Sequence, residues 1–132
     1  MRGADMKAVI RVMVAVAAVG VMAPLPMALA KNPRAVVAKG TCTDRSTAKL
    51  KLSPDNGRIE VAFEVDQNRN GVTWRWGLAR SGRTLKSGAA VTRAPSGSFT
   101  VRRFVTNRPG PDRIVARAAR AGGVTCTAIA TL

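Results

Sequence analysis

The sequence contains no histidine and no tyrosine, and only 7 of its 132 residues are aspartate or glutamate. Without histidine, the chain lacks both the general base of Ser-His-Asp and Cys-His active sites and the commonest metal ligand. It also lacks a G-x-S-x-G motif, a phosphate-binding glycine loop and a dinucleotide-binding fingerprint. These absences predict a protein that is not an enzyme and that binds no cofactor.

Cysteine is scarce too, and its two copies, Cys42 and Cys126, lie far apart in the chain. A zinc site would lack its usual histidine partners, so the alternatives are two free thiols or one disulfide. We predict a disulfide between Cys42 and Cys126. Such a bond predicts an oxidising environment outside the cytosol.

The first thirty residues have the order of parts found in secretory signal peptides. Three basic residues lead into an uncharged apolar run at 12–22, and the small-residue triplet Ala28-Leu29-Ala30 follows two prolines. We predict that residues 1–30 are a signal peptide, that cleavage follows Ala30, and that the protein is secreted. The alternative is a membrane anchor at 12–30, a stretch close to the length that spans a bilayer but interrupted by the two prolines. Contact with a membrane is expected only in that case.

The remaining residues are enough for one domain. Residues 31–41 show no sustained pattern and are predicted to be a flexible leader. From residue 42 onward, short runs alternate apolar and polar residues and are separated by turn residues, most clearly at 59–66 and 72–79. A period of two without helical periodicity predicts an all-β domain at 42–132, a single antiparallel β-sandwich of about seven strands.

Three local expectations follow from the same pattern. Residues 81–93 are predicted to form a small edge hairpin with turns at both Ser-Gly pairs. A bulge near Arg102 and Arg103 would bring Phe104 to the buried face. A three-residue loop at 121–123 would set the register that buries Cys126 and exposes the arginines.

The paired tryptophans Trp74 and Trp76 and the corner Gly110-Pro111-Asp112 are similar to features of immunoglobulin-like and fibronectin-III-like sandwiches. The chain as a whole resembles small secreted β-sandwich proteins of high-GC Gram-positive bacteria. This resemblance implies neighbouring first and last strands, where a Cys42–Cys126 bridge fits. The chain departs from true immunoglobulin domains because its cysteines are not at the usual positions and no tyrosine can form a tyrosine corner.

Basic residues dominate the charge, with 22 lysines and arginines and a net charge of +15. Polyanions are therefore natural partners, although the composition of a GC-rich genome or a need for solubility also explains the excess. Nucleic acid is not the expected partner, because no reading motif is present and the five aromatic residues belong to predicted core faces. We expect a monomeric, secreted, non-enzymatic binding module, acting on anionic cell-envelope polymers. The alternative is a secreted inhibitor or adhesion module that recognises a protein partner through its loops.

The sandwich assignment brings several arginines to one sheet face without an acid among them. The hypothesis is that this face binds polyanions through bidentate hydrogen bonds, and the alternative is a merely solvated face. The candidate residues are Arg75, Arg80, Arg113, Arg117 and Arg120.

Two patterns that include carboxylate residues are weak evidence for a functional site. Asp66, Asn68 and Asn70 match the start of a calcium loop, but Gly77 stands where the loop needs a bidentate glutamate. We therefore predict no metal site and interpret this segment as a turn. Glu64 and Asp66 share one strand face at a glycosidase-like spacing, but an exposed face does not raise the pKa of an acid, so we interpret them as solubilising residues.

Overall fold

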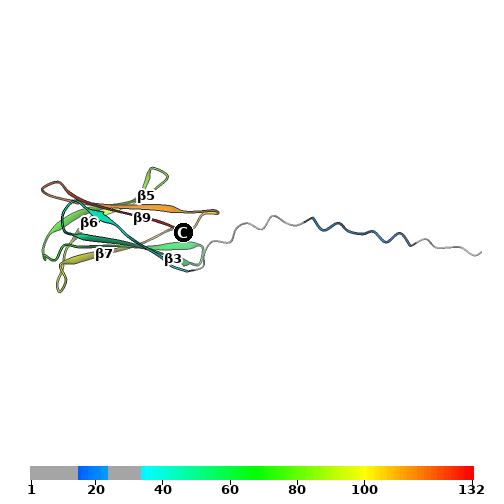
Figure 1. The fold of residues 1–132 in the computed structure, drawn as a ribbon, viewed down its shortest axis with the longest axis horizontal. Coiled ribbons are helices and arrows are strands. Elements are labelled where there is room, and N and C mark those ends of the chain that lie inside the picture. Colours follow the sequence, from blue (N-terminus) through cyan, green and yellow to red (C-terminus); the bar gives the residue numbers. More distant parts are fainter. Residues whose placement is uncertain (1–14, 24–33) are drawn as a thin grey trace, which may run out of the picture.

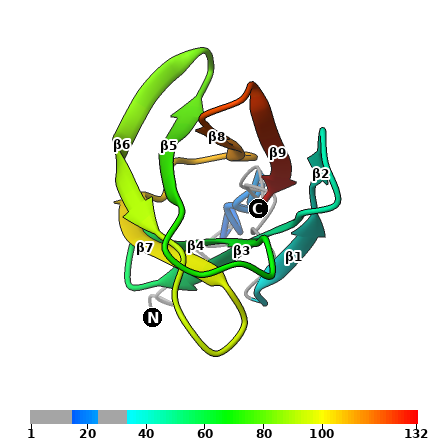
Figure 2. The same ribbon diagram turned by 90° about the vertical axis from the view of Figure 1, so that its left-hand side faces the viewer.

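The computed structural model describes residues 15–23 and 34–132 (Figure 1). Residues 34–132 form nine strands in two antiparallel sheets that pack as a sandwich (Figure 2). The predicted all-β sandwich is therefore confirmed, with nine strands in place of about seven. The predicted cleavage site after Ala30 lies outside the described residues. Within those residues, no helix is long and apolar enough to cross a membrane.

The first sheet has four strands in the order β1-β3-β4-β7. Its strands are β1 (Val36–Lys39), β3 (Thr47–Asp55), β4 (Arg58–Asp66) and β7 (Ser98–Thr106). The hairpin between β3 and β4 turns on Asn56 and Gly57, whose φ values of 46° and 77° suit a two-residue turn of the type that matches strand twist.

The second sheet has five strands in the order β2-β9-β8-β5-β6. Its strands are β2 (Thr41–Cys42), β9 (Val124–Thr131), β8 (Arg113–Arg120), β5 (Thr73–Arg80) and β6 (Arg83–Val91). The expected proximity of first and last strands is confirmed, because β2 pairs with β9 and Cys42 is bonded to Cys126. The β3–β4 hairpin stays within the first sheet, and the chain crosses to the second sheet between β4 and β5.

The core lies between the sheets and consists of the alternate side chains of each strand. Trp74 and Trp76 are buried, as their shared face predicts. Phe99 connects the two sheets, since its ring centroid lies 6.4 Å from that of Phe63 and 6.2 Å from that of Trp74.

The interpretation of residues 31–41 as a flexible leader is wrong from residue 36 onward, where β1 and the start of β2 lie. Val36–Lys39 pairs with β3, and Val36 and Ala38 pack against the core. The strand is too short for its alternation to be recognised in the sequence. β1 is stabilised by its pairing with β3 and by its burial against the core, and both depend on residues further along the chain.

The predicted small edge hairpin at 81–93 is also wrong beyond its first turn. β6 runs without interruption through Ser87 and Gly88. Gly88 is needed because the Trp76 ring occupies the space beside it, and an added Cβ would lie 2.9 Å from Cζ2 of that ring. The register of this pair of strands shifts between Leu78 and Ala79 of β5, and the extra residue is Leu85 of β6.

The predicted bulge near Arg102 and Arg103 is absent, because β7 pairs with β4 without a register shift. Phe104 therefore lies on the outer face with 41% of its surface exposed. Arg103 takes the inward parity at the sheet edge, where its guanidinium carbon lies 5.0 Å from the centre of the Trp76 ring. A cation–aromatic contact accommodates the charge that the bulge was expected to turn outward.

The predicted three-residue loop at 121–123 is confirmed. Arg120 pairs with Val124 and Ala118 with Cys126, which places Cys126 on the buried face. Gly122 and Gly123 adopt φ values of 90° and 76°, which favour glycine.

Candidate functional site

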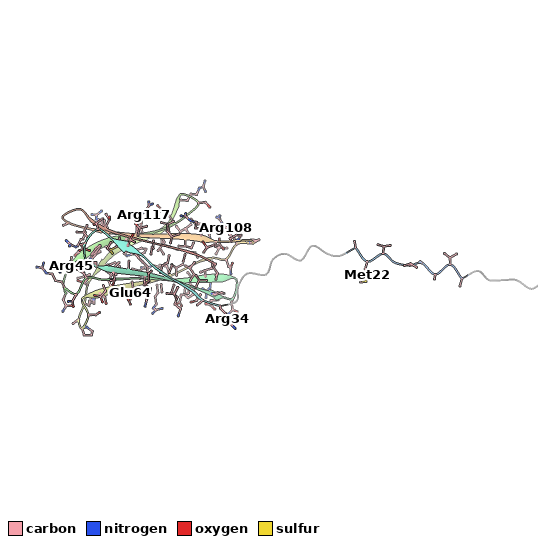
Figure 3. The ribbon with its side chains drawn as sticks, in the orientation of Figure 1. Met22, Arg34, Arg45, Glu64, Arg108 and Arg117 are labelled. Carbon is pink, nitrogen blue, oxygen red and sulfur yellow. A yellow bond between two sulfur atoms is a disulfide. The ribbon has the colours of Figure 1, made fainter. Side chains whose placement is uncertain are left out.

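The outward side of the second sheet carries the arginines that the sequence brings together most closely. We call its outward residues the basic face, formed by Arg75, Gly77, Arg113, Val115, Arg117, Ala119, Thr125, Thr127 and Ile129. Arg75, Arg113 and Arg117 are all exposed on it. Figure 3 labels Arg117 along this side of the sandwich.

A shallow hollow of about 430 Å³ lies on the basic face between Arg75 and Arg117. Gly77 is directly opposite Arg117, and Arg75 is opposite Ala119, so the arginines are diagonal neighbours on β5 and β8. Diagonal side chains of paired strands start about 7–8 Å apart, within reach of one extended ligand. Gly77 and Ala119 are too small to fill the space between the arginines, and this produces the hollow.

Two threonines of β9 form the other side of the hollow. Thr125 and Thr127 line it, and the inward-pointing Cys126 lies between them on the strand. The disulfide to Cys42 fixes β9 to β2 at this position. The hollow therefore combines two guanidinium groups with hydroxyl groups that can donate hydrogen bonds to an anion.

Acidic side chains lie elsewhere in the described chain, and most are engaged by bases. Of the six acids in residues 34–132, five form ion pairs. The sixth, Asp66, accepts a hydrogen bond from the backbone N–H of Asn68 at 2.9 Å. None of the six belongs to the basic face, so the charges of Arg75 and Arg117 are not cancelled by an acid there.

The outward side of the first sheet has the opposite character. Lys49 lies opposite Glu64, with 3.9 Å between the charged atoms. Arg102 lies 3.1 Å from Glu60 on the same face, and Lys51 is opposite the neutral Ala62. Glu64 is labelled on this side of the molecule in Figure 3. Exposed ion pairs of this kind add little stability, but their carboxylates offset part of the positive charge on this side of the sheet.

Arg80 was expected to extend the row of exposed arginines, and this prediction is wrong. It is 94% buried and its Nη1 lies 3.0 Å from Oδ1 of Asp112. The cause is strand parity, because Arg80 follows Trp74 and Leu78 on the inward side of β5. A buried arginine requires a charged partner, which Asp112 provides.

Arg120 was expected at the far end of the same row, and the structure corrects this too. It takes the inward parity of β8 and is only partly exposed. Its Nη2 lies 3.0 Å from Oδ2 of Asp44, and its guanidinium carbon lies 5.7 Å from the centre of the Trp74 ring. Arg80 and Arg120 thus lie at opposite ends of the inter-sheet space, each with its own aspartate.

Arg113 does belong to the basic face but lies apart from the hollow. It lies four positions before Arg117 on β8, a distance of about 13 Å along a strand. Val115 and its cross-strand partner Ile129 lie between these two positions, and Ile129 is 43% exposed. Along the basic face, Arg75 and Arg117 are therefore neighbours, and the apolar pair Val115 and Ile129 separates them from Arg113.

The calcium-loop residues form a tight turn. Asn68 has a φ of 58°, and its N–H binds the side chain of Asp66. The backbone N–H of Gln67 donates to the carbonyl oxygen of Gly97, which attaches this turn to the next loop. In residues 15–23 and 34–132, no three histidine, cysteine or acidic side chains gather at one metal position. Hydrogen bonding within the turn accounts for these residues.

Comparison of the chain with protein-family models, with curated proteins and with solved structures gives no match. The similarity to immunoglobulin-like proteins of Gram-positive bacteria stays a prediction.

Proposed function

We propose that the protein is a secreted, non-catalytic module that binds anionic polymers of the cell envelope through its basic face. One observation carries this proposal. Arg75 and Arg117 flank a hollow on a sheet face without acids, while the acids of the described chain are engaged elsewhere. If the positive charge served only solubility, we would expect it to be spread over the surface and not concentrated around one hollow.

The chemistry of the face suits a polymer with repeated phosphate or carboxylate groups. A guanidinium group binds either anion through two parallel hydrogen bonds, and the hydroxyls of Thr125 and Thr127 add further donors. Arg113 lies far enough from the pair to contact a later repeat of the same polymer. The hollow is shallow and open to solvent, which suits an extended chain better than a small enclosed substrate.

The compartment is consistent with this role. A disulfide persists in an oxidising environment, and this one joins β2 to the last strand. Secretion through cleavage after Ala30 and a location at the cell envelope are part of the proposal.

The test compares two variants with equal loss of charge. In the first, Arg75, Arg113 and Arg117 are changed to glutamine. In the second, the exposed arginines of three loops at one end of the sandwich, Arg45, Arg69 and Arg93, are changed to glutamine. Retention on immobilised polyphosphate and on immobilised polyglutamate is measured for both.

We expect the basic-face variant to elute at clearly lower salt than the loop variant. Equal losses would mean that binding depends on net charge alone, and the proposal would fail. A larger loss in the loop variant would instead support recognition through the loops.

A further inference from the structure

Strand β6 forms one edge of the five-stranded sheet and is paired on one side only within the described chain. It has no proline, and after the extra residue Leu85 its pairing with β5 is regular from Lys86 to Val91. Its charged residues on the inward side, Arg83 and Lys86, both lie before Ser87. The other outer strands are less open. β1 and β2 have four and two residues, and β7 carries the inward-pointing Arg103. Short length and inward charges are common means of blocking strand addition at sheet edges.

The direction of the free backbone groups of β6 follows from the ladder. The N–H of Thr92 donates to the carbonyl oxygen of Val72 at 2.9 Å, so Thr92 is directed toward the β5 side. Backbone groups of successive residues in an antiparallel strand alternate in direction. Ala90 and Gly88 therefore also face β5. Ser87, Ala89 and Val91 present their N–H and C=O groups to the open edge.

A hollow of about 340 Å³ adjoins the end of this edge. Val91, which is 41% exposed, Arg93 and Phe99 contribute to its lining. The loop that forms its outer side is held in place, because the N–H of Arg93 donates to the carbonyl oxygen of Ser98 and that of Gly97 donates to the carbonyl oxygen of Arg93. The hollow can receive one apolar side chain beside an exposed guanidinium group.

We propose that Ser87–Val91 and this hollow bind an extended, acidic segment of a partner protein as a sixth strand of the sheet. Gly88, Ala89 and Ala90 have side chains small enough for close approach. Lys86 and Arg93 flank the segment and favour a carboxylate-bearing partner. This site adjoins the basic face, because Ala89 lies opposite Arg75, but it uses the free backbone groups of β6 and does not depend on the proposed function.

A second copy of the chain fits this edge less well. Antiparallel self-pairing centred on Ala89 would place Lys86 of one copy opposite Thr92 of the other, next to its Arg93. Like charges brought close together across a strand pair are unfavourable. Charge complementarity therefore favours an acidic peptide.

The experiment titrates the isotope-labelled protein with two blocked synthetic peptides of alternating valine and threonine. One peptide ends in two glutamates and the other in two lysines. Amide chemical shifts and amide exchange are followed by NMR. We expect shifts confined to residues 87–100, slowed exchange at Ser87, Ala89 and Val91, and at least tenfold weaker binding of the lysine peptide.

Two variants sharpen the test. Ala89→Pro removes an N–H group that points to the open edge and leaves the hydrogen bonds to β5 in place. It should weaken the binding of the glutamate peptide at least tenfold. Arg93→Glu should do the same without altering the backbone, whereas Arg45→Glu, also on an exposed loop, should not. A dispersed amide spectrum like that of the original protein shows that each variant is folded.

Binding that survives both Ala89→Pro and Arg93→Glu, or equal binding of the two peptides, would overturn the proposal. Slowed amide exchange at Ser87, Ala89 and Val91 in the absence of peptide, together with a dimer in sedimentation, would also overturn it. A second copy of the chain would then occupy the edge.

Discussion

Arg80 and Asp112 form an ion pair inside the sandwich, with 3.0 Å between Nη1 and Oδ1 and with 6% and 2% of their side chains exposed. Nη1 of Arg80 also donates to the carbonyl oxygen of Thr106 at 2.7 Å. The second carboxylate oxygen of Asp112 accepts a hydrogen bond from the N–H of Arg108 at 2.9 Å. The pair therefore joins the end of β5 to both ends of the connection between β7 and β8.

Changing Arg80 to methionine should destabilise the fold by about 3–5 kcal/mol, because the buried carboxylate of Asp112 would lose its charge partner. The measurement is the free energy of unfolding in urea. Arg75→Met, on the exposed face, is the matched control and should change stability by no more than about 0.5 kcal/mol. Similar small losses in both variants would contradict this account of the pair.

The Cys42–Cys126 disulfide joins residues separated by 84 positions. In the chain-entropy model, a loop of this size stabilises the folded state by about 4–5 kcal/mol. The double variant Cys42→Ala/Cys126→Ala should lose most of that free energy. Because the bond holds β2 to β9, amide exchange should increase first in β1 and β2. Exchange through global unfolding should rise in both sheets, and the absence of an additional increase in β1 and β2 would argue against this local effect.

Gly97 and Gly57 both have positive φ, at 68° and 77°, but their surroundings differ. A Cβ at Gly97 would collide with the backbone of Asn68 and Arg69, whereas nothing lies within 4 Å of one at Gly57. Gly57→Ala should therefore cost about 1–2 kcal/mol from backbone conformation alone. Gly97→Ala should cost a further 1–3 kcal/mol or so, because packed backbone must move. Thermal unfolding of both variants measures the difference, and equal costs would contradict the close packing of these two loops.

The pKa of Asp44 gives the stability a defined pH dependence. Burial raises this pKa, but the hydrogen bond from the backbone N–H of Ser46 and the hydrogen bond and charge of Arg120 lower it more, so the pKa lies below its ordinary 3.8. A carboxyl group with a lowered folded pKa stabilises the fold above its unfolded pKa. That contribution is lost as the pH falls below 3.8 through the folded pKa.

Asp44→Asn should therefore lower stability at neutral pH and flatten its decline in the acid range. Urea midpoints measured between about pH 6 and pH 2 test this. A variant that declines as steeply as the original protein would show that Asp44 does not contribute.

The alternation of apolar and polar residues predicts the two layers of the fold, and in the structure the same alternation continues to the strand ends. Arg80 and Arg120 have the same parity as the buried residues of their strands, and that parity alone places them inward. Their charge suggested the opposite. The partners that make burial possible, Asp112 and Asp44, lie 32 and 76 positions away, so only the folded chain brings them together.

The extent of β6 and the hollow between Arg75 and Arg117 are only weakly indicated by the sequence. β6 shows no clear alternation, because its edge position leaves most of its side chains exposed. Arg75 and Arg117 were predicted to lie close together, but the hollow between them depends on the register that places Gly77 opposite Arg117. Register across non-consecutive strands follows from the whole fold, and local spacing does not determine it.

The salt dependence of polyphosphate binding tests the role of the basic face most directly. The logarithm of the binding constant should fall linearly with the logarithm of salt concentration, with a slope set by the number of anion contacts. Arg75→Gln/Arg117→Gln should reduce that slope by about 0.7–0.9 for each guanidinium removed, whereas Arg45→Gln/Arg69→Gln should leave it unchanged. Equal slopes for both double variants would contradict a polyanion site between Arg75 and Arg117.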